Sequence, residues 1–506
     1  MSEPSTTAPV HSTGSPHPSN DLESALDALA PALAALVRGE LPDPSPDGRR
    51  GLGADTAWQA ELDRPLPGPG AGAAETLRQL AGPVTRYGAP FLAPGFSGWI
   101  IGAPTAVPVA AGLVTSVAGQ QRYLGFSGNL LEAVALRWVA ELCGLPADLQ
   151  GVFSSGGSVA NLLGLGAARQ RAYERIGADP AKDGMAGLPP GRIYASQEVH
   201  HALLRAAGVL GLGRTGLRLV PADDAQRLDV PELRRAVEAD LSAGLVPVAV
   251  VGIAGTTSTG AVDPLAEIAE VAAEHETWFH VDGAYGLFGV LDETRADAFS
   301  GVKRADSVAV DMHKWLALPT GTGATYVRDT TVLGRTFTQE PSAPVEGAFT
   351  NLAGALDSPW DVLGTPYQEW SLELSAAARG IAVWATLHEI GREGMRARVV
   401  AHNRLARLLA DRVRAEPRLE LLHKPELSIC CFRVRGAPDD GDDAVDARNQ
   451  RLLRSLHAEG LHVPSGTVVD GHFAIRACFV NPRQAEGDVH GLVDAVLEHD
   501  RRTTAA

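Results

Sequence analysis

Short apolar and β-branched runs alternate with segments rich in Ala, Leu and Glu through the middle of the chain, from about residue 153 to residue 328. The runs expected to form strands lie at residues 192–195, 217–220, 247–253, 278–281, 307–310 and 324–327. Near-continuous apolar strands separated by helices are typical of a largely parallel sheet covered on both faces. The pattern therefore predicts an α/β fold.

The pattern changes beyond residue 373, where a long helical segment at residues 374–414 leads into a second group of strands and helices. The later strands are expected at residues 429–434 and 474–479, and the later helices at residues 445–459 and 486–498. Strands mixed with helices after a connecting helix are typical of an α+β domain. We expect a large domain at residues 101–373, followed by the connecting helix and a small C-terminal domain at residues 374–506.

The N-terminal part of the chain differs from both of these regions. Residues 1–20 are rich in Ser, Thr, Pro and His and lack the basic and apolar regions of a secretory signal, which predicts a disordered tail. Apolar residues at helical spacing in residues 22–38, and a further helical segment near residues 76–79, predict a helical arm over residues 21–100.

Composition narrows the possible partners. A chain of 506 residues with 45% hydrophobic residues can bury a large core, and its net charge of -16 disfavours nucleic acid as the main partner. The apolar segments are shorter or more broken by Gly and Pro than a membrane span of about 20 residues. The four cysteines form neither a disulfide framework nor a CxxC metal pattern. We expect a cytosolic protein that binds no membrane and no metal.

A Gly/Ser-rich turn precedes one of the predicted helices, with the sequence SSGGSVAN at residues 154–161. Small residues let backbone N–H groups approach an anion closely, and a helix N-terminus adds partial positive charge. The turn therefore suits a phosphate group, although similar turns often serve only as helix caps. No GK[ST] follows, which excludes a nucleotide P-loop.

Three other polar motifs follow strand-like runs, where open α/β sheets bind their ligands. They are YASQEVHH at residues 194–201, HVDGAY at residues 280–285 and DMHKW at residues 311–315. A carboxylate such as Asp282 can keep a pyridinium nitrogen protonated, and a partly desolvated lysine such as Lys314 can form an imine with an aldehyde. His200 can stack on a planar ring. Each residue alone could equally be a capping, packed or surface residue.

The order of the motifs SSGGSVANL, HVDGAYG and VDMHKW resembles the group II decarboxylases that depend on pyridoxal 5′-phosphate (PLP). This family includes aromatic-L-amino-acid, glutamate and diaminobutyrate decarboxylases, and the resemblance runs from about residue 89 to the C-terminus. It implies fold type I, the aspartate-aminotransferase type. It also implies PLP as cofactor, an L-amino acid as substrate, and a homodimer with the active site at the subunit interface.

The resemblance implies a role for each motif residue. Lys314 would hold PLP as a Schiff base, Asp282 would pair with the pyridine nitrogen, and His200 would stack on the ring. The other cofactor residues would be Gly157 and Ser158 at the phosphate, Asn161 nearby, Ala284 beneath the ring, Thr257 behind Asp282, and His313 beside Lys314. The substrate pocket would include Trp99, Ile100 and Phe126, which favour an aromatic or branched apolar side chain.

Two positions depart from the family pattern. The family commonly has a tyrosine, implicated in protonating the substrate carbon, where Ala343 stands, and it often has two arginines where residues 375–378 read SAAA before Arg379. The proton donor could instead be His200 or Tyr367.

The departures could also mean different chemistry, namely decarboxylation coupled to oxidation by O2, which yields an aldehyde. A non-catalytic protein of the same fold, or an activity like that of sphingosine-phosphate lyase, fits the motif set less well.

Overall fold

The computed structural model describes residues 59–80, 88–122, 126–337, 365, 367–437 and 439–505, together with residues 27, 30, 31 and 34. These residues belong to two compact units, one of Met1–Pro90 with Ala458–Gly460 and one of Phe91–His457 with Leu461–Ala506. The first unit contains the helices α2 (Gln59–Leu62) and α3 (Ala73–Gln79). The predicted tail and most of the helix predicted at residues 22–38 lie outside the described residues. The predicted domain boundaries stay a prediction.

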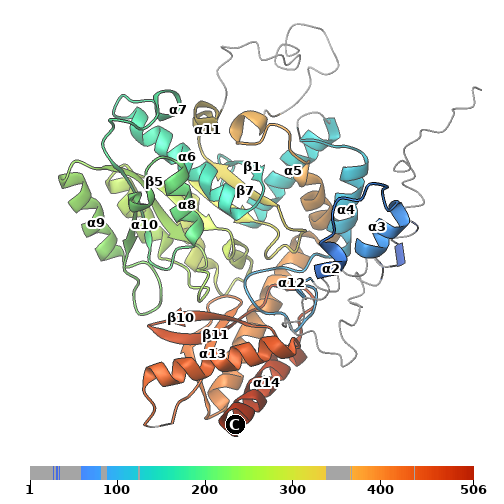
Figure 1. Ribbon diagram of the computed structural model, residues 1–506. Helices are drawn as coiled ribbons and strands as arrows, with labels where there is room; N and C mark the ends of the chain where they lie inside the picture. The colour runs from blue at the N-terminus through green and yellow to red at the C-terminus, as the bar shows by residue number, and fades with distance from the viewer. Residues whose placement is uncertain are drawn as a thin grey trace, which may run out of the picture. The chain divides into compact units, whose positions relative to one another are not determined.

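The second unit contains a seven-stranded sheet with the order β1-β7-β6-β5-β4-β2-β3 (Figure 1). Its strands are β1 (Gln150–Ser154), β2 (Gly191–Ser196), β3 (Leu217–Val220), β4 (Val246–Ile253), β5 (Trp278–Gly283), β6 (Ser307–Asp311) and β7 (Gly323–Val327). Strands β3, β2, β4, β5 and β6 are parallel, whereas β7 runs antiparallel to both β6 and β1. The six strands predicted from the apolar runs are all present, whereas β1 was not predicted. The largely parallel α/β sheet is confirmed.

Helices pack on both faces of this sheet, as the alternation of side chains along β5 shows. Phe279 lies close to Gly252 on the side where α10 (Leu265–Glu274) packs, whereas the next residue, His280, reaches Asn161 of α6 (Gly157–Glu174). Both faces of the strand are therefore buried, which explains its unbroken apolar pattern.

The other helices of this region connect the strands or flank the sheet (Figure 1). They are α4 (Ala106–Val117), α5 (Phe126–Leu142), α7 (Pro180–Asp183), α8 (His201–Val209), α9 (Val230–Ser242) and α11 (Thr330–Phe337). Short 3-10 helices lie at Arg214–Gly216, Leu287–Leu291, Ala296–Arg304 and Tyr367–Trp370.

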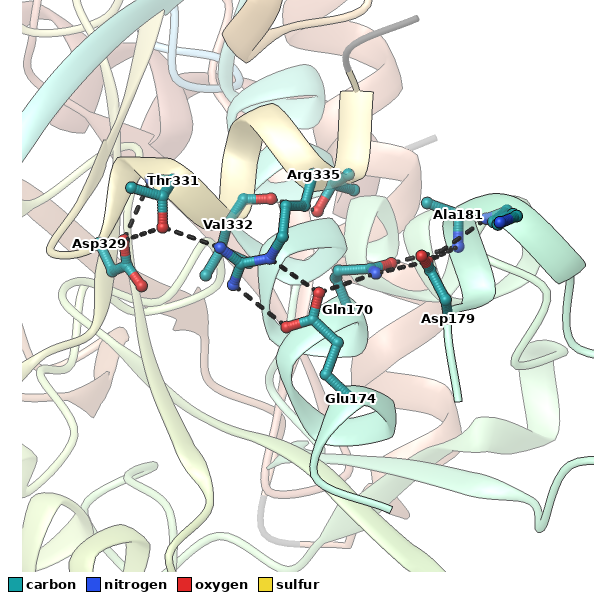
Figure 2. A network of polar contacts seen from close by, with 10 residues as sticks. Gln170, Glu174, Asp179, Ala181, Asp329, Thr331, Val332 and Arg335 are labelled. Atoms are coloured by element: carbon teal, nitrogen blue, oxygen red, sulfur yellow. Dashed lines mark hydrogen bonds and ion pairs between the residues drawn. The ribbon is translucent and has the colours of Figure 1, made fainter. Parts of the chain in front are cut away.

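A polar network holds α11 against the C-terminal half of α6 (Figure 2). The guanidinium of Arg335 makes two hydrogen bonds to the carboxylate of Glu174, at 2.8 and 3.1 Å. Gln170 donates to Glu174 at 3.0 Å and to Asp179 at 2.7 Å, and Asp179 caps the short helix α7. Because α6 begins within the Gly/Ser-rich turn at residues 154–161, this network anchors the helix at the end away from that turn.

The C-terminal part forms a four-stranded antiparallel sheet with the order β10-β11-β9-β8. Its strands are β8 (Leu419–His423), β9 (Ile429–Val434), β10 (Ser465–Val469) and β11 (His472–Cys478), and its helices are α12 (Arg379–Ala415), α13 (Asp442–Glu459) and α14 (Glu486–Ala505). Apolar residues of the three helices pack with β9 and β11 in one core. The α+β arrangement agrees with the prediction, but β8 and β10 were not predicted. Helix α12 is interrupted at Gly391.

A buried group of charges joins the start of α12 to the loop after Lys314. Arg379 makes two hydrogen bonds to Glu373, at 2.8 and 2.9 Å, and its Nε donates to the carbonyl of Gly321 at 3.0 Å. Glu132 of α5 accepts from the backbone N–H of Gly380 at 3.1 Å, close to the buried Arg122. Burial raises the pKa of the Glu132 carboxyl to about 7.

This raised pKa predicts a pH-dependent stability. The folded protein binds the Glu132 proton more tightly than the unfolded chain, so Glu132 should lose stabilising free energy as the pH rises from about 4.5 to about 7. One proton changes the unfolding free energy by at most about 1.4 kcal/mol per pH unit. Relative to the wild type, Glu132→Gln should therefore gain up to ~3 kcal/mol of unfolding free energy between pH 5 and pH 8. Urea unfolding of both proteins at pH 5 and pH 8 measures this gain. If the difference in unfolding free energy between variant and wild type were the same at both pH values, Glu132 would be ionised in the folded protein at both.

Among the residues that the structure describes, no helix is both long and apolar enough to cross a membrane.

Candidate active site

A cavity of about 260 Å³ opens at the carboxyl ends of the parallel strands β2, β4, β5 and β6. It is lined by Ser155, Gly156, Gly157, Ser158, Val159, Asn161, His200, Ile253, Gly255, Thr257, Asp282, Ala284, Tyr285, Asp311, His313 and Lys314. All nine residues predicted to contact the cofactor are in this set, although they come from segments up to 157 positions apart. The structure therefore brings the separate motifs into one site.

One end of the cavity is formed by the first turn of α6, which requires glycine. Gly156 has a φ of +133°, a backbone conformation that L side chains rarely adopt. A Cβ on Gly157 would lie 2.9 Å from Oδ2 of Asp311 and 3.1 Å from Cβ of Ala284. The backbone at the N-terminus of α6 can therefore line the cavity only because these positions lack side chains, and its N–H groups suit an anion.

Lys314 lies in the turn that follows β6 and is mostly buried, with about a fifth of its side chain exposed. Its Nζ is 4.0 Å from Oδ2 of Asp311. The same oxygen accepts the backbone N–H of Gly157 at 2.9 Å, and Oδ1 lies 2.6 Å from Nδ1 of His313 without the alignment of a hydrogen bond. Asp311 thus joins the lysine, His313 and the α6 turn.

The sequence motifs included Asp311, but no role was predicted for it. A signal for it was present in the sequence, since Asp311 directly follows the apolar run at residues 307–310 and precedes Lys314 by three positions.

Asp282 is the penultimate residue of β5, and its side chain is largely buried in the cavity wall. Its Oδ1 accepts the backbone N–H of Ala284 at 3.1 Å, which fixes the orientation of the carboxylate. The strand-end position is the one expected from the sequence. The capping bond to Ala284 also shows that a turn-capping role and a place in the cavity are compatible.

His200 lies at the N-terminal cap of α8, where its Nδ1 accepts the backbone N–H of Ala202 at 3.2 Å. Burial, reinforced by the nearby positive charge of Lys314, lowers the pKa of His200 to about 4. The imidazole is therefore neutral at physiological pH. Because Nδ1 accepts a hydrogen bond, the proton must sit on Nε2, which is left to donate.

The C-terminal sheet also reaches this site. Arg476 of β11 is buried and donates to Ser465 at 3.0 Å and to the backbone carbonyl of Thr257. Thr257 itself lines the cavity. The sequence did not predict this contact between Arg476 and Thr257, because no local pattern pairs β11 with a loop more than 200 residues earlier in the chain.

Of the three residues predicted to form the substrate pocket, Trp99 and Ile100 do not line this cavity. Trp99 is 58% exposed and its ring centroid lies 6.1 Å from that of Phe96, while Ile100 is buried. Phe126 begins α5, but its side chain lies outside the described residues. Within one chain Trp99 and Ile100 do not form an apolar wall of the cavity. The role of all three positions stays a prediction.

Of the two predicted proton donors, one lies at the cavity and the other does not. His200 lines the cavity, whereas Tyr367 is buried elsewhere and burial raises its pKa to about 12. Ala343 lies outside the described residues. His200 is therefore the one of these candidates that the structure places in the site.

Comparisons with known proteins show the family. Residues 128–435 match the family model of the pyridoxal-dependent decarboxylase conserved domain. The chain is 30% identical over 450 residues to L-2,4-diaminobutyrate decarboxylase of Rhizobium meliloti (strain 1021). This alignment covers 87% of this chain and 84% of that protein. The chain is also 28% identical over 367 residues to phenylacetaldehyde synthase of Arabidopsis thaliana, in an alignment that covers 71% of this chain and 71% of that protein.

Among solved structures, Oryza sativa TDC with PLP and tryptamine matches with a TM-score of 0.86 at 25% identity, covering 97% of this chain and 100% of that one.

Proposed function

Because the chain belongs to the pyridoxal-dependent decarboxylases, with PLP as its cofactor, we propose that it removes the α-carboxylate of an L-amino acid with an aromatic or branched apolar side chain and releases the amine. The observation that carries this proposal is the single cavity in which Lys314, Asp282 and the α6 turn meet.

The donor set of the cavity fits the three functional groups of PLP. The N–H groups at the N-terminus of α6 and the hydroxyl of Ser158 would bind the phosphate. The amine of Lys314 would bind the aldehyde carbon, and the carboxylate of Asp282 would keep the pyridine nitrogen protonated. When bound, PLP supplies an electron sink for the pair released as CO2 leaves.

The remaining residues would orient the substrate. Neutral His200 can donate from Nε2 to a carboxylate placed above the cavity, which holds the bond to be broken at a fixed angle. The amine of Lys314, whose Nζ lies 4.0 Å from Oδ2 of Asp311, would also be placed to carry a proton.

An amino-acid panel tests the substrate class. With PLP-loaded protein, L-tryptophan, L-phenylalanine, L-tyrosine and L-leucine should release CO2 faster than L-glutamate and L-2,4-diaminobutyrate, measured by trapped CO2 and by mass detection of the amine. The support for this order is the similarity to a structure that contains tryptamine. Reaction of the acidic or the diamino substrates alone would contradict it, and the similarity to a diaminobutyrate decarboxylase makes this comparison informative.

We also propose that the protein is a cytosolic homodimer. Helix α4 exposes Val109, Leu113, Val114 and Val117, of which Val114 is 64% exposed. A helix with this much exposed apolar surface is typical of an interface. A second copy would cover it and could also complete the substrate pocket near Trp99. Light scattering on the holoenzyme should give twice the mass of the chain.

The oxidative alternative is supported by the similarity to phenylacetaldehyde synthase and by Ala343 at the position of the family tyrosine. In that reaction one amino acid, one O2 and one water give one aldehyde, CO2, ammonia and hydrogen peroxide. Assays of amine, aldehyde and peroxide in air and under nitrogen separate the two reactions. Amine formation at the same rate under both gases would exclude the oxidative route.

A further inference from the structure

A row of hydrogen bonds crosses the buried interior from β5 to the first turn of α6. Nε1 of Trp278 lies 2.7 Å from Oγ of Ser307, which lies 2.7 Å from Nδ1 of His280. Nε2 of His280 lies 2.8 Å from Oδ1 of Asn161, whose Nδ2 donates to the carbonyl of Gly157 at 3.0 Å. The four side chains involved are all at least 95% buried.

The chemistry of the groups fixes the direction of every bond. The Asn161 amide donates to Gly157, so its Oδ1 is an acceptor and His280 must carry its proton on Nε2. Nδ1 of His280 then accepts from the Ser307 hydroxyl, whose oxygen accepts from the Trp278 indole. Burial lowers the pKa of His280 to about 4, in keeping with a neutral ring.

The sequence of α6 leaves space for this ring. A Cβ on Gly164 would lie 2.8 Å from Cε1 and 2.9 Å from Nδ1 of His280. Gly164 and Asn161 are three residues apart and therefore lie on the same face of the helix. Gly164 and Asn161 of α6 thus contact the imidazole from one side, which gives Gly164, a residue that does not line the cavity, a structural role.

His280 also shares a strand with Asp282, two positions later and on the same face. Gly157 is at the phosphate end of the proposed cofactor site and Asp282 is at the pyridine end. We infer that His280 is a positioning residue that sets the spacing between the two ends of the PLP site, by tying β5 to the first turn of α6 through Asn161. This inference rests on the proposed roles of Gly157 and Asp282.

The affinity for a ligand that contacts both the phosphate end and the pyridine end of the site should depend on this spacing. The affinity for a ligand that contacts only the phosphate end should not. In His280→Leu both ring bonds are lost, and we expect the dissociation constant of PLP to rise about 10- to 100-fold. The affinity of the apoprotein for inorganic phosphate, measured as competition against PLP reconstitution, should change less than about twofold. The absorbance of bound PLP gives both values without measuring activity.

Two further variants separate positioning from folding. His280→Gln keeps a donor that can reach Asn161 and should recover most of the PLP affinity. Gly164→Ala leaves every hydrogen-bonding side chain in place but displaces the ring, so it should weaken PLP as His280→Leu does.

Asn449→Leu is the matched control. Asn449 is a buried amide of α13 that bonds Val434 and Val445 and does not line the cavity. It should lower the melting temperature of the apoprotein and leave PLP affinity unchanged.

The outcomes distinguish the inference from the proposed function. PLP affinity unchanged in His280→Leu, or a parallel loss of phosphate and PLP affinity in it, would overturn the positioning role while the wild type still decarboxylates amino acids. A wild type that reacts with no amino acid would instead overturn the proposed function.

Discussion

Replacing Lys314 with alanine should lower amino-acid decarboxylation by more than about 1,000-fold, because the amine is expected to bind the cofactor covalently and then to carry a proton. The visible absorbance of the PLP-loaded protein should be lost at the same time. CO2 release and absorbance spectra on the same preparation measure both effects. Borohydride treatment of the wild type should attach the cofactor to the peptide that contains Lys314.

The chain offers an unusually clear control for this experiment. Its sequence contains four lysines, Lys182, Lys303, Lys314 and Lys424, and Lys314 alone lines the cavity. Lys303→Ala removes an exposed lysine and should leave both activity and absorbance unchanged. If borohydride instead labelled another lysine, or if Lys314→Ala kept its absorbance, the assignment of Lys314 would be wrong.

The sequence predicted the sheet because burial on both faces makes each parallel strand an apolar run that can be recognised locally. Strands β8 (Leu419–His423) and β10 (Ser465–Val469) were missed because polar residues interrupt them, and most of their positions are partly buried or exposed. An antiparallel sheet with one face on a helical core gives such mixed patterns, which resemble loops. Local pattern therefore found the first sheet more completely than the second.

The order of the motifs predicted the site, and the structure adds contacts between residues that are far apart in the sequence. Asp282 and Lys314 stood at strand ends in the sequence, so their meeting at one edge of the sheet could be expected. The contact of Arg476 with Thr257 depends on how two sheets pack, which no local pattern encodes. The bond between His280 and Asn161 likewise joins residues 119 positions apart. Of the three positions from which the substrate pocket was predicted, Trp99 and Ile100 do not line the cavity of one chain.

Asp282→Asn should lower decarboxylation about 100- to 1,000-fold, a loss comparable to removal of one strong electrostatic contact in other active sites. The substitution keeps the size of the side chain and an oxygen that can accept the N–H of Ala284, so the turn after β5 should survive. It removes the negative charge that would hold the pyridine nitrogen protonated, and the cofactor then withdraws electrons less strongly. We expect kcat to fall while PLP still binds Lys314, measured by steady-state CO2 release and by absorbance.

Asp263→Asn is the matched control, because Asp263 is also a buried carboxyl beside β4 and accepts the N–H groups of Ile253 and Leu228, at 2.8 Å each. It does not line the cavity. Loss of kcat in Asp282→Asn with near-normal kcat in Asp263→Asn would separate the electronic role from the general effect of replacing a buried, hydrogen-bonded carboxyl by an amide. Equal losses in the two variants would contradict a special role for Asp282. The comparison is decisive because both residues cap backbone N–H groups, and only Asp282 faces the space where the cofactor ring would lie.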